Sequence, residues 1–190
     1  MRCFAALQLA ADTRQAVAEE IDRLRLLGRA VGWVPAANLH LTLRFLGEQP
    51  EDALASLGDA LAEAARAATP FPLAFRGVGG FPGLERPRIL WAGVHEGARE
   101  ARAIQARLEA ALEARGFGRE TRPWHPHLTL GRVFDPRRWA RDAGPELRAA
   151  LGRALTRPSP PTRVEAIALV RSQLSPAGAR YTLLAEVPLG

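Results

Sequence analysis

The tetrapeptide His-Leu-Thr-Leu occurs twice in the chain, at residues 40–43 and again at residues 127–130. The alternation of polar and apolar residues predicts a β-strand in each copy, with the leucines on a buried face and the histidine and threonine on the opposite face. A tryptophan and a proline precede each copy at short distance. We therefore predict two related halves, each of which contributes one strand to a shared cleft.

The remaining hydrophobic pattern predicts a mixture of strands and helices. We expect strands near residues 4–9, 38–46, 73–78, 89–94, 127–133, 164–170 and 180–187. We expect helices near residues 13–27, 50–68, 98–115 and 136–155, the last with a break near Gly144-Pro145. Residues 175–178 should form the turn between the last two strands. Some strands follow one another with only a turn between them, which favours an α+β fold over a doubly wound parallel sheet.

Composition limits the classes of function. All 26 basic residues are arginine and the formal net charge is +6, which fits a phosphate-bearing partner but also a genome-wide preference for arginine. Because lysine is absent and no glycine-rich loop matches, P-loop and dinucleotide-binding chemistry is excluded. The single cysteine, Cys3, cannot form an internal disulfide, so we expect a cytoplasmic protein. We also expect no signal peptide and no membrane span.

The chain has four histidines, and His40 and His127 occupy the same position in the two repeats. Imidazole titrates near neutral pH, so one histidine can act as a base while the other acts as an acid. Such a pair suits in-line displacement at phosphorus, with water activated on one side and the departing ribose oxygen protonated on the other. Thr42 and Thr129 can donate hydrogen bonds to the phosphate. This scheme needs no metal and no cofactor.

Two other interpretations compete. His125 and His127 are spaced so that one strand could present both to a zinc ion, with His40 as a third ligand. A non-catalytic RNA-binding module would combine the arginines with aromatic side chains that stack on bases. We expect the candidate aromatic residues, Phe45, Phe75, Phe81 and Trp91, to lie in the core instead.

Two His-x-Thr motifs 87 residues apart (127 minus 40) resemble the signature of the 2H phosphoesterase superfamily. Asn38 to Gly47 and Pro126 to Arg132 are most similar to the motifs of its RNA 2',3'-cyclic phosphodiesterase branch, also called the 2'-5' RNA ligase family. The resemblance implies one bilobal domain over residues 1–190. Its two pseudo-symmetric lobes would each be an antiparallel sheet flanked by helices, around a central cleft that carries both motifs.

The resemblance also implies the reaction and the role of each site residue. The enzyme would open RNA 2',3'-cyclic phosphate ends, tRNA fragments among them, to 2'-phosphates. His40 would be the proton donor and His127 the proton acceptor, with Thr42, Thr129 and Arg132 on the phosphate. In the reverse reaction a 5'-hydroxyl would take the place of water and form a 2'-5' link without ATP. ADP-ribose cyclic phosphate hydrolysis and RNA 3'-end trimming are alternatives within the superfamily. We expect a monomer.

Overall fold

The computed structural model describes residues 1–175 and 178–190. The helices are α1 (Ala11–Arg25), α2 (Ala53–Arg66), α3 (Ala98–Glu113), α4 (Trp139–Asp142) and α5 (Gly144–Leu151), with a 3-10 turn at Ala36–Asn38. The strands are β1 (Arg2–Gln8), β2 (Val31–Trp33), β3 (His40–Glu48), β4 (Phe71–Phe81), β5 (Ile89–Glu96), β6 (His127–Val133), β7 (Thr162–Val164), β8 (Ala166–Ser175) and β9 (Gly178–Pro188). The predicted turn before β9 includes residues 176 and 177, which lie outside the described residues.

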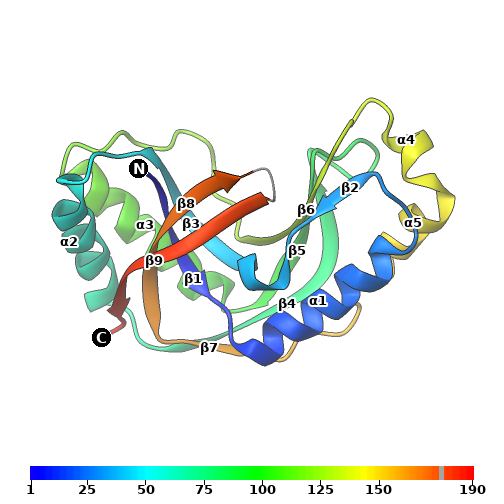
Figure 1. Ribbon diagram of the computed structural model, residues 1–190. Coiled ribbons are helices and arrows are strands. Elements are labelled where there is room, and N and C mark those ends of the chain that lie inside the picture. Colours follow the sequence, from blue (N-terminus) through cyan, green and yellow to red (C-terminus); the bar gives the residue numbers. More distant parts are fainter. Residues whose placement is uncertain (176–177) are drawn as a thin grey trace.

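All strand pairings among the described residues are antiparallel, in the order β7-β4-β5-β6-β3-β1-β8-β9, with β2 on the edge of β6. The sheet is strongly curled (Figure 1), with α2 and α3 together near β1, β3 and β8, and with α1, α4 and α5 at the other end. The predicted α+β fold of antiparallel strands flanked by helices is confirmed. The short strands β2 and β7 were not predicted.

The helices form because each presents one apolar stripe to the sheet. Val17, Ile21 and Leu24 recur at helical spacing on α1 and are all buried. The alanine-rich α2 buries Leu57 and Leu61 on one face, where small neighbours let it pack closely against α3. The predicted break in the helical stretch over residues 136–155 is confirmed, because α4 and α5 are divided at Gly144, which has a positive φ of 67°. No helix in the described part of the chain is both long and apolar enough to cross a membrane.

The two halves of the sheet meet where the two repeats pair. Strands β3 and β6 are joined through the single pair Leu41–Leu128, and each leucine follows its motif histidine by one residue. An antiparallel pair of equivalent residues defines a local twofold axis. Counted from this pair, positions 40 and 129 and positions 42 and 127 face each other in the register, although Leu41–Leu128 is the one pair formed between the described residues of these strands.

The same β-bulge follows the motif in both halves. In the β1–β3 ladder Ala6 pairs with Thr42 and Ala5 with Arg44, so Leu43 has no partner of its own. In the β5–β6 ladder Trp91 pairs with Thr129 and Leu90 with Gly131, which skips Leu130 in the same way. An extra residue reverses the side on which later side chains emerge. The fifth residue after each histidine therefore returns to the histidine face.

Candidate functional site

His40 is held by two hydrogen bonds at the start of β3. Its Nδ1 lies 2.7 Å from the carbonyl oxygen of Asn38 and its Nε2 lies 3.0 Å from Oγ1 of Thr42. A carbonyl only accepts, so Nδ1 carries a proton and Nε2 is the atom that gains or loses one. The imidazole stacks on Phe4 at 4.7 Å and meets the edge of Tyr181 at 5.3 Å. The orientation of the ring is therefore fixed from three sides.

His127 has the equivalent backbone contact at the start of β6. Its Nδ1 lies 2.6 Å from the carbonyl oxygen of His125, again two residues earlier, so Nδ1 donates and Nε2 is left to exchange protons. The ring of Phe81 packs edge-on against it at 5.0 Å, and Trp91 lies 6.4 Å away. Both repeats thus present an imidazole of the same tautomer on an aromatic support.

Burial shifts the titration of both histidines in the same direction. Desolvation lowers the pKa of His40, while its bond to the Asn38 carbonyl opposes the shift. Desolvation likewise lowers the pKa of His127, the His125 carbonyl opposes it, and positive charge at His125 and Arg132 adds to it. Near neutral pH the unliganded site therefore favours neutral imidazoles.

A cavity of about 450 Å³ lies over the motif face of the sheet. His40, Thr42, Thr129 and Arg132, from both halves of the chain, all line it. His127 is not among its lining residues and stands in the adjoining aromatic cluster. The structure therefore brings four of the five predicted site residues to one cavity, whereas the fifth, His127, lies among Phe81, Trp91 and His125.

The paired bulges explain why two residues line this cavity although regular strand alternation would place them on the opposite face of the sheet. Arg132 and Thr129 are three residues apart, which on a regular strand places them on opposite faces, yet both line the cavity. Phe45 stands in the same relation to Thr42. It is 58% exposed and also lines the cavity. The prediction that Phe45 lies in the core is therefore wrong, whereas Phe75 is fully buried as predicted.

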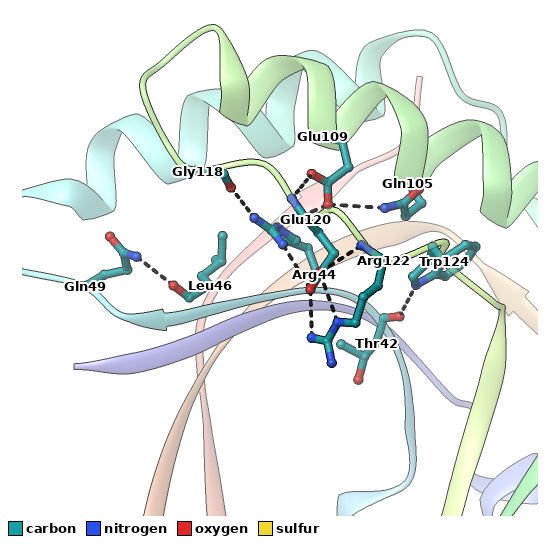
Figure 2. A network of polar contacts seen from close by, with 10 residues as sticks. All are labelled: Thr42, Arg44, Leu46, Gln49, Gln105, Glu109, Gly118, Glu120, Arg122 and Trp124. Carbon is teal, nitrogen blue, oxygen red and sulfur yellow. Dashed lines mark hydrogen bonds and ion pairs between the residues drawn. The ribbon is translucent and has the colours of Figure 1, made fainter. Parts of the chain in front are cut away.

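The bulge also turns Arg44 away from the cavity and into a polar network behind it (Figure 2). Its Nε lies 3.1 Å from Oε1 of Glu109 on α3, its Nη1 lies 3.6 Å from Oε2 of Glu120, and its Nη2 donates to the carbonyl of Gly118. Indole Nε1 of Trp124 donates to the carbonyl of Thr42 at 3.2 Å. The irregular segment before His127 is thereby tied to the strand that carries His40.

Several site residues were not predicted from the sequence. Phe4 and Tyr181 flank His40 from β1 and β9, more than 30 residues away in the chain on either side. Only strand pairing across the sheet brings them together, so no local signal marks them. For Asn38 the functional group is a backbone carbonyl, which any residue type supplies.

The metal interpretation finds no support in the arrangement of these side chains. Across residues 1–175 and 178–190, no group of three or more histidine, cysteine, aspartate or glutamate residues is placed to hold a metal ion. The rings of His125 and His127 stand 6.4 Å apart, nearly parallel. His125 is exposed outside the strand, next to the aromatic cluster.

A curled antiparallel sheet with two His-x-Thr motifs about a local twofold axis defines the class of two-histidine phosphoesterases. A sequence model of the 2'-5' RNA ligase superfamily matches residues 13–175. An RNA 2',3'-cyclic phosphodiesterase from Methanothermobacter thermautotrophicus is 35% identical over 182 residues, which cover 96% of this chain and 95% of that protein. One from Thermus thermophilus is 37% identical over 100% of this chain and 90% of that protein. The chain belongs to the 2'-5' RNA ligase superfamily.

Solved structures show the same fold. A crystal structure of the Thermus thermophilus protein TT0787 superposes with a TM-score of 0.75 at 34% identity and covers 100% of this chain and 98% of that one. E. coli LigT complexed with 3'-AMP superposes with a TM-score of 0.72 at 28% identity, over 99% of this chain and 97% of LigT. The predicted family and fold are therefore confirmed.

Proposed function

We propose that this chain hydrolyses the 2',3'-cyclic phosphate at RNA ends to a 2'-phosphate. The observation that carries the proposal is the pairing of the two repeats at Leu41–Leu128, which sets two equivalent His-Thr pairs side by side about one point. In-line displacement needs a proton acceptor and a proton donor on opposite sides of phosphorus. The names of the relatives from Methanothermobacter and Thermus support the same reaction.

In the proposed reaction His40 is the acid and His127 is the base. The cavity beside His40 is walled by Phe4, Phe45 and Tyr181, which suits a nucleoside, so the departing ribose 3'-oxygen lies on that side. Protonated Nε2 of His40 gives it a proton. Neutral Nε2 of His127 takes a proton from the attacking water. The 3'-oxygen–phosphorus bond breaks as the water oxygen bonds to phosphorus, which leaves the phosphate on the 2'-oxygen.

Thr42, Thr129 and Arg132 bind the phosphate in this scheme. The two hydroxyls approach from opposite halves of the sheet, and the guanidinium of Arg132 supplies positive charge to the non-bridging oxygens. No metal ion is required. A 5'-hydroxyl in place of water gives a 2'-5' link, so we include ATP-independent ligation as the reverse reaction. We further propose that residues 1–190 act as one bilobal domain and as a cytoplasmic monomer.

The test uses a short RNA that ends in a 2',3'-cyclic phosphate, incubated with the enzyme in excess chelator. Mass spectrometry should show the gain of one water, and comparison with synthetic 2'- and 3'-phosphate ends should place the phosphate on the 2'-oxygen. His40→Ala and His127→Ala should each reduce turnover by about 10²–10⁴-fold. His95→Ala, an exposed histidine away from the cavity, is the matched control and should retain activity.

Three outcomes separate the alternatives. Turnover near the wild-type level in either motif variant would contradict the acid–base assignment. Activity that appears only after zinc is added would revive the metal interpretation. If the wild-type protein binds the RNA without hydrolysing it, and the double histidine variant binds equally well, the chain is a binding module.

A further inference from the structure

A second hollow opens beside the catalytic cavity on the far side of His40. It has a volume of about 310 Å³ and shares Phe4, Asn38, His40 and Tyr181 with the cavity. Beyond these shared residues its walls are formed by Gln8 of β1, Arg14 of α1 and Leu183 of β9. Leu183 is 53% exposed, so an apolar surface is available there.

A third hollow of about 440 Å³ continues from the second, with which it shares Arg14 and Ala37. It runs along the beginning of α1, past Gln15 and Ala18. Because neighbouring hollows share lining residues, the three follow one another from the proposed phosphate site to the first turns of α1, and we call this succession the groove.

Arg14 is the charged residue of the second and third hollows. It is half-buried in the first turn of α1, and its backbone N–H donates to the carbonyl of Ala10 at 3.0 Å. Its guanidinium makes no ion pair or side-chain hydrogen bond with any residue in the described ranges. No aspartate or glutamate is found among the described residues that line the second and third hollows. A half-buried, unpaired guanidinium in an acid-free groove suits a phosphate group.

We propose that the second hollow binds the nucleotide on the 5' side of the terminal one, with Arg14 on the phosphodiester that joins the two. The inference rests on the proposed function and deepens it by naming the contact that would distinguish an RNA strand from a mononucleotide. The terminal nucleoside uses its 2'- and 3'-oxygens for the cyclic phosphate, so the strand can leave the cavity only through the 5'-oxygen. Tyr181 and Leu183 offer the upstream base an apolar surface.

The test compares a nucleoside 2',3'-cyclic monophosphate with a dinucleotide whose 3' end carries the same cyclic phosphate. The wild-type enzyme should prefer the dinucleotide by about tenfold in kcat/KM, the contribution of one charged contact to phosphate. Arg14→Gln should abolish this preference and leave mononucleotide turnover unchanged, while Arg14→Lys should retain part of it. Arg66→Gln, an exposed arginine at the end of α2, removes the same charge far from the groove and should retain all of it.

A second readout is the salt dependence of binding to a dinucleotide product that ends in a 2'-phosphate. Loss of one phosphate contact should reduce the slope of log Kd against log salt by about 0.7 in Arg14→Gln. Equal kcat/KM values for the two substrates in the wild type would overturn the subsite. So would an Arg14→Gln variant that keeps both the wild-type preference for the dinucleotide and the wild-type salt slope. If the wild-type protein hydrolyses neither the mononucleotide nor the dinucleotide, the proposed function is overturned, and with it the subsite.

Discussion

Arg44→Met should destabilise the protein far more than the loss of an ordinary surface arginine. The change keeps the length and apolar stem of the side chain but removes the guanidinium from Glu109, Glu120 and the carbonyl of Gly118. The side chains of Arg44 and Glu109 are only 12% and 16% exposed. Removal of Arg44 therefore leaves a carboxylate in a position that water scarcely reaches.

The magnitude follows from this burial. Breaking a buried ion pair by removing one partner costs about 3–5 kcal/mol. Glu109 keeps a hydrogen bond from Gln105 at 3.3 Å and a long one from the Glu120 backbone at 3.5 Å. These contacts and the residual exposure reduce the expected loss to roughly 2–3 kcal/mol. For a chain of this size the loss lowers Tm by roughly 4–12 °C.

Urea unfolding followed by far-ultraviolet circular dichroism measures this loss, with Arg115→Met as the matched control. Arg115 pairs with Glu63 at 2.8 Å, but these side chains are 26% and 53% exposed. Its loss should therefore cost at most about 1 kcal/mol. Adding Glu109→Gln to Arg44→Met should recover part of the stability, because the unpaired charge is gone. Equal losses in the two arginine variants, or no recovery in the double variant, would refute the reasoning.

Two further predictions concern pH and packing. Burial lowers the pKa of both His40 and His127 below the usual 6.5, and the histidine that acts as the acid must be protonated. The kcat/KM for a cyclic nucleotide should therefore rise as the pH falls from about 8 to 6. An optimum above about pH 7 would contradict the assignment. A Cβ at Gly79 would lie 2.3 Å from the ring of Trp91, so Gly79→Ala should cost roughly 1–3 kcal/mol in chemical unfolding. Gly58 on α2 has open space around it, so Gly58→Ala should instead stabilise by about 0.5–1 kcal/mol; the opposite order would contradict the packing described here.

The repeat and the hydrophobic periods predicted most of the elements because both are local properties of the chain. The alternation in His40-Leu41-Thr42-Leu43 set the strand, its buried leucines and its polar face, and all of these are found. Helices α1, α2 and α3, and the segment that contains the shorter α4 and α5, were predicted from the same kind of pattern. Strands β2 and β7 were missed because three-residue strands carry too little pattern to be recognised.

Strict alternation failed beyond the motif, where the bulge at Leu43 is a property of two strands rather than one. A single strand gives no sign that its partner skips a residue, so Phe45 was expected in the core although it lines the cavity. The role of Arg132 beside Thr129 was predicted only through the family resemblance. Tyr181 reaches the cavity, and Arg14 the neighbouring hollow, through long-range packing, which no local pattern encodes.

The scarcity of backbone pairing between β3 and β6 has a consequence for how the two motif strands are held together. Seven residue pairs join β1 to β3 and five join β5 to β6, whereas Leu41–Leu128 is the one pair between β3 and β6 within the described ranges. The rest of the connection is made by side chains and helices, because Trp124 donates to the carbonyl of Thr42, Arg44 binds Glu109 and Glu120, and α2 packs on α3. The position of one motif strand relative to the other therefore depends on these contacts, and a substitution at Trp124 or Arg44 should alter it although neither residue lines the cavity.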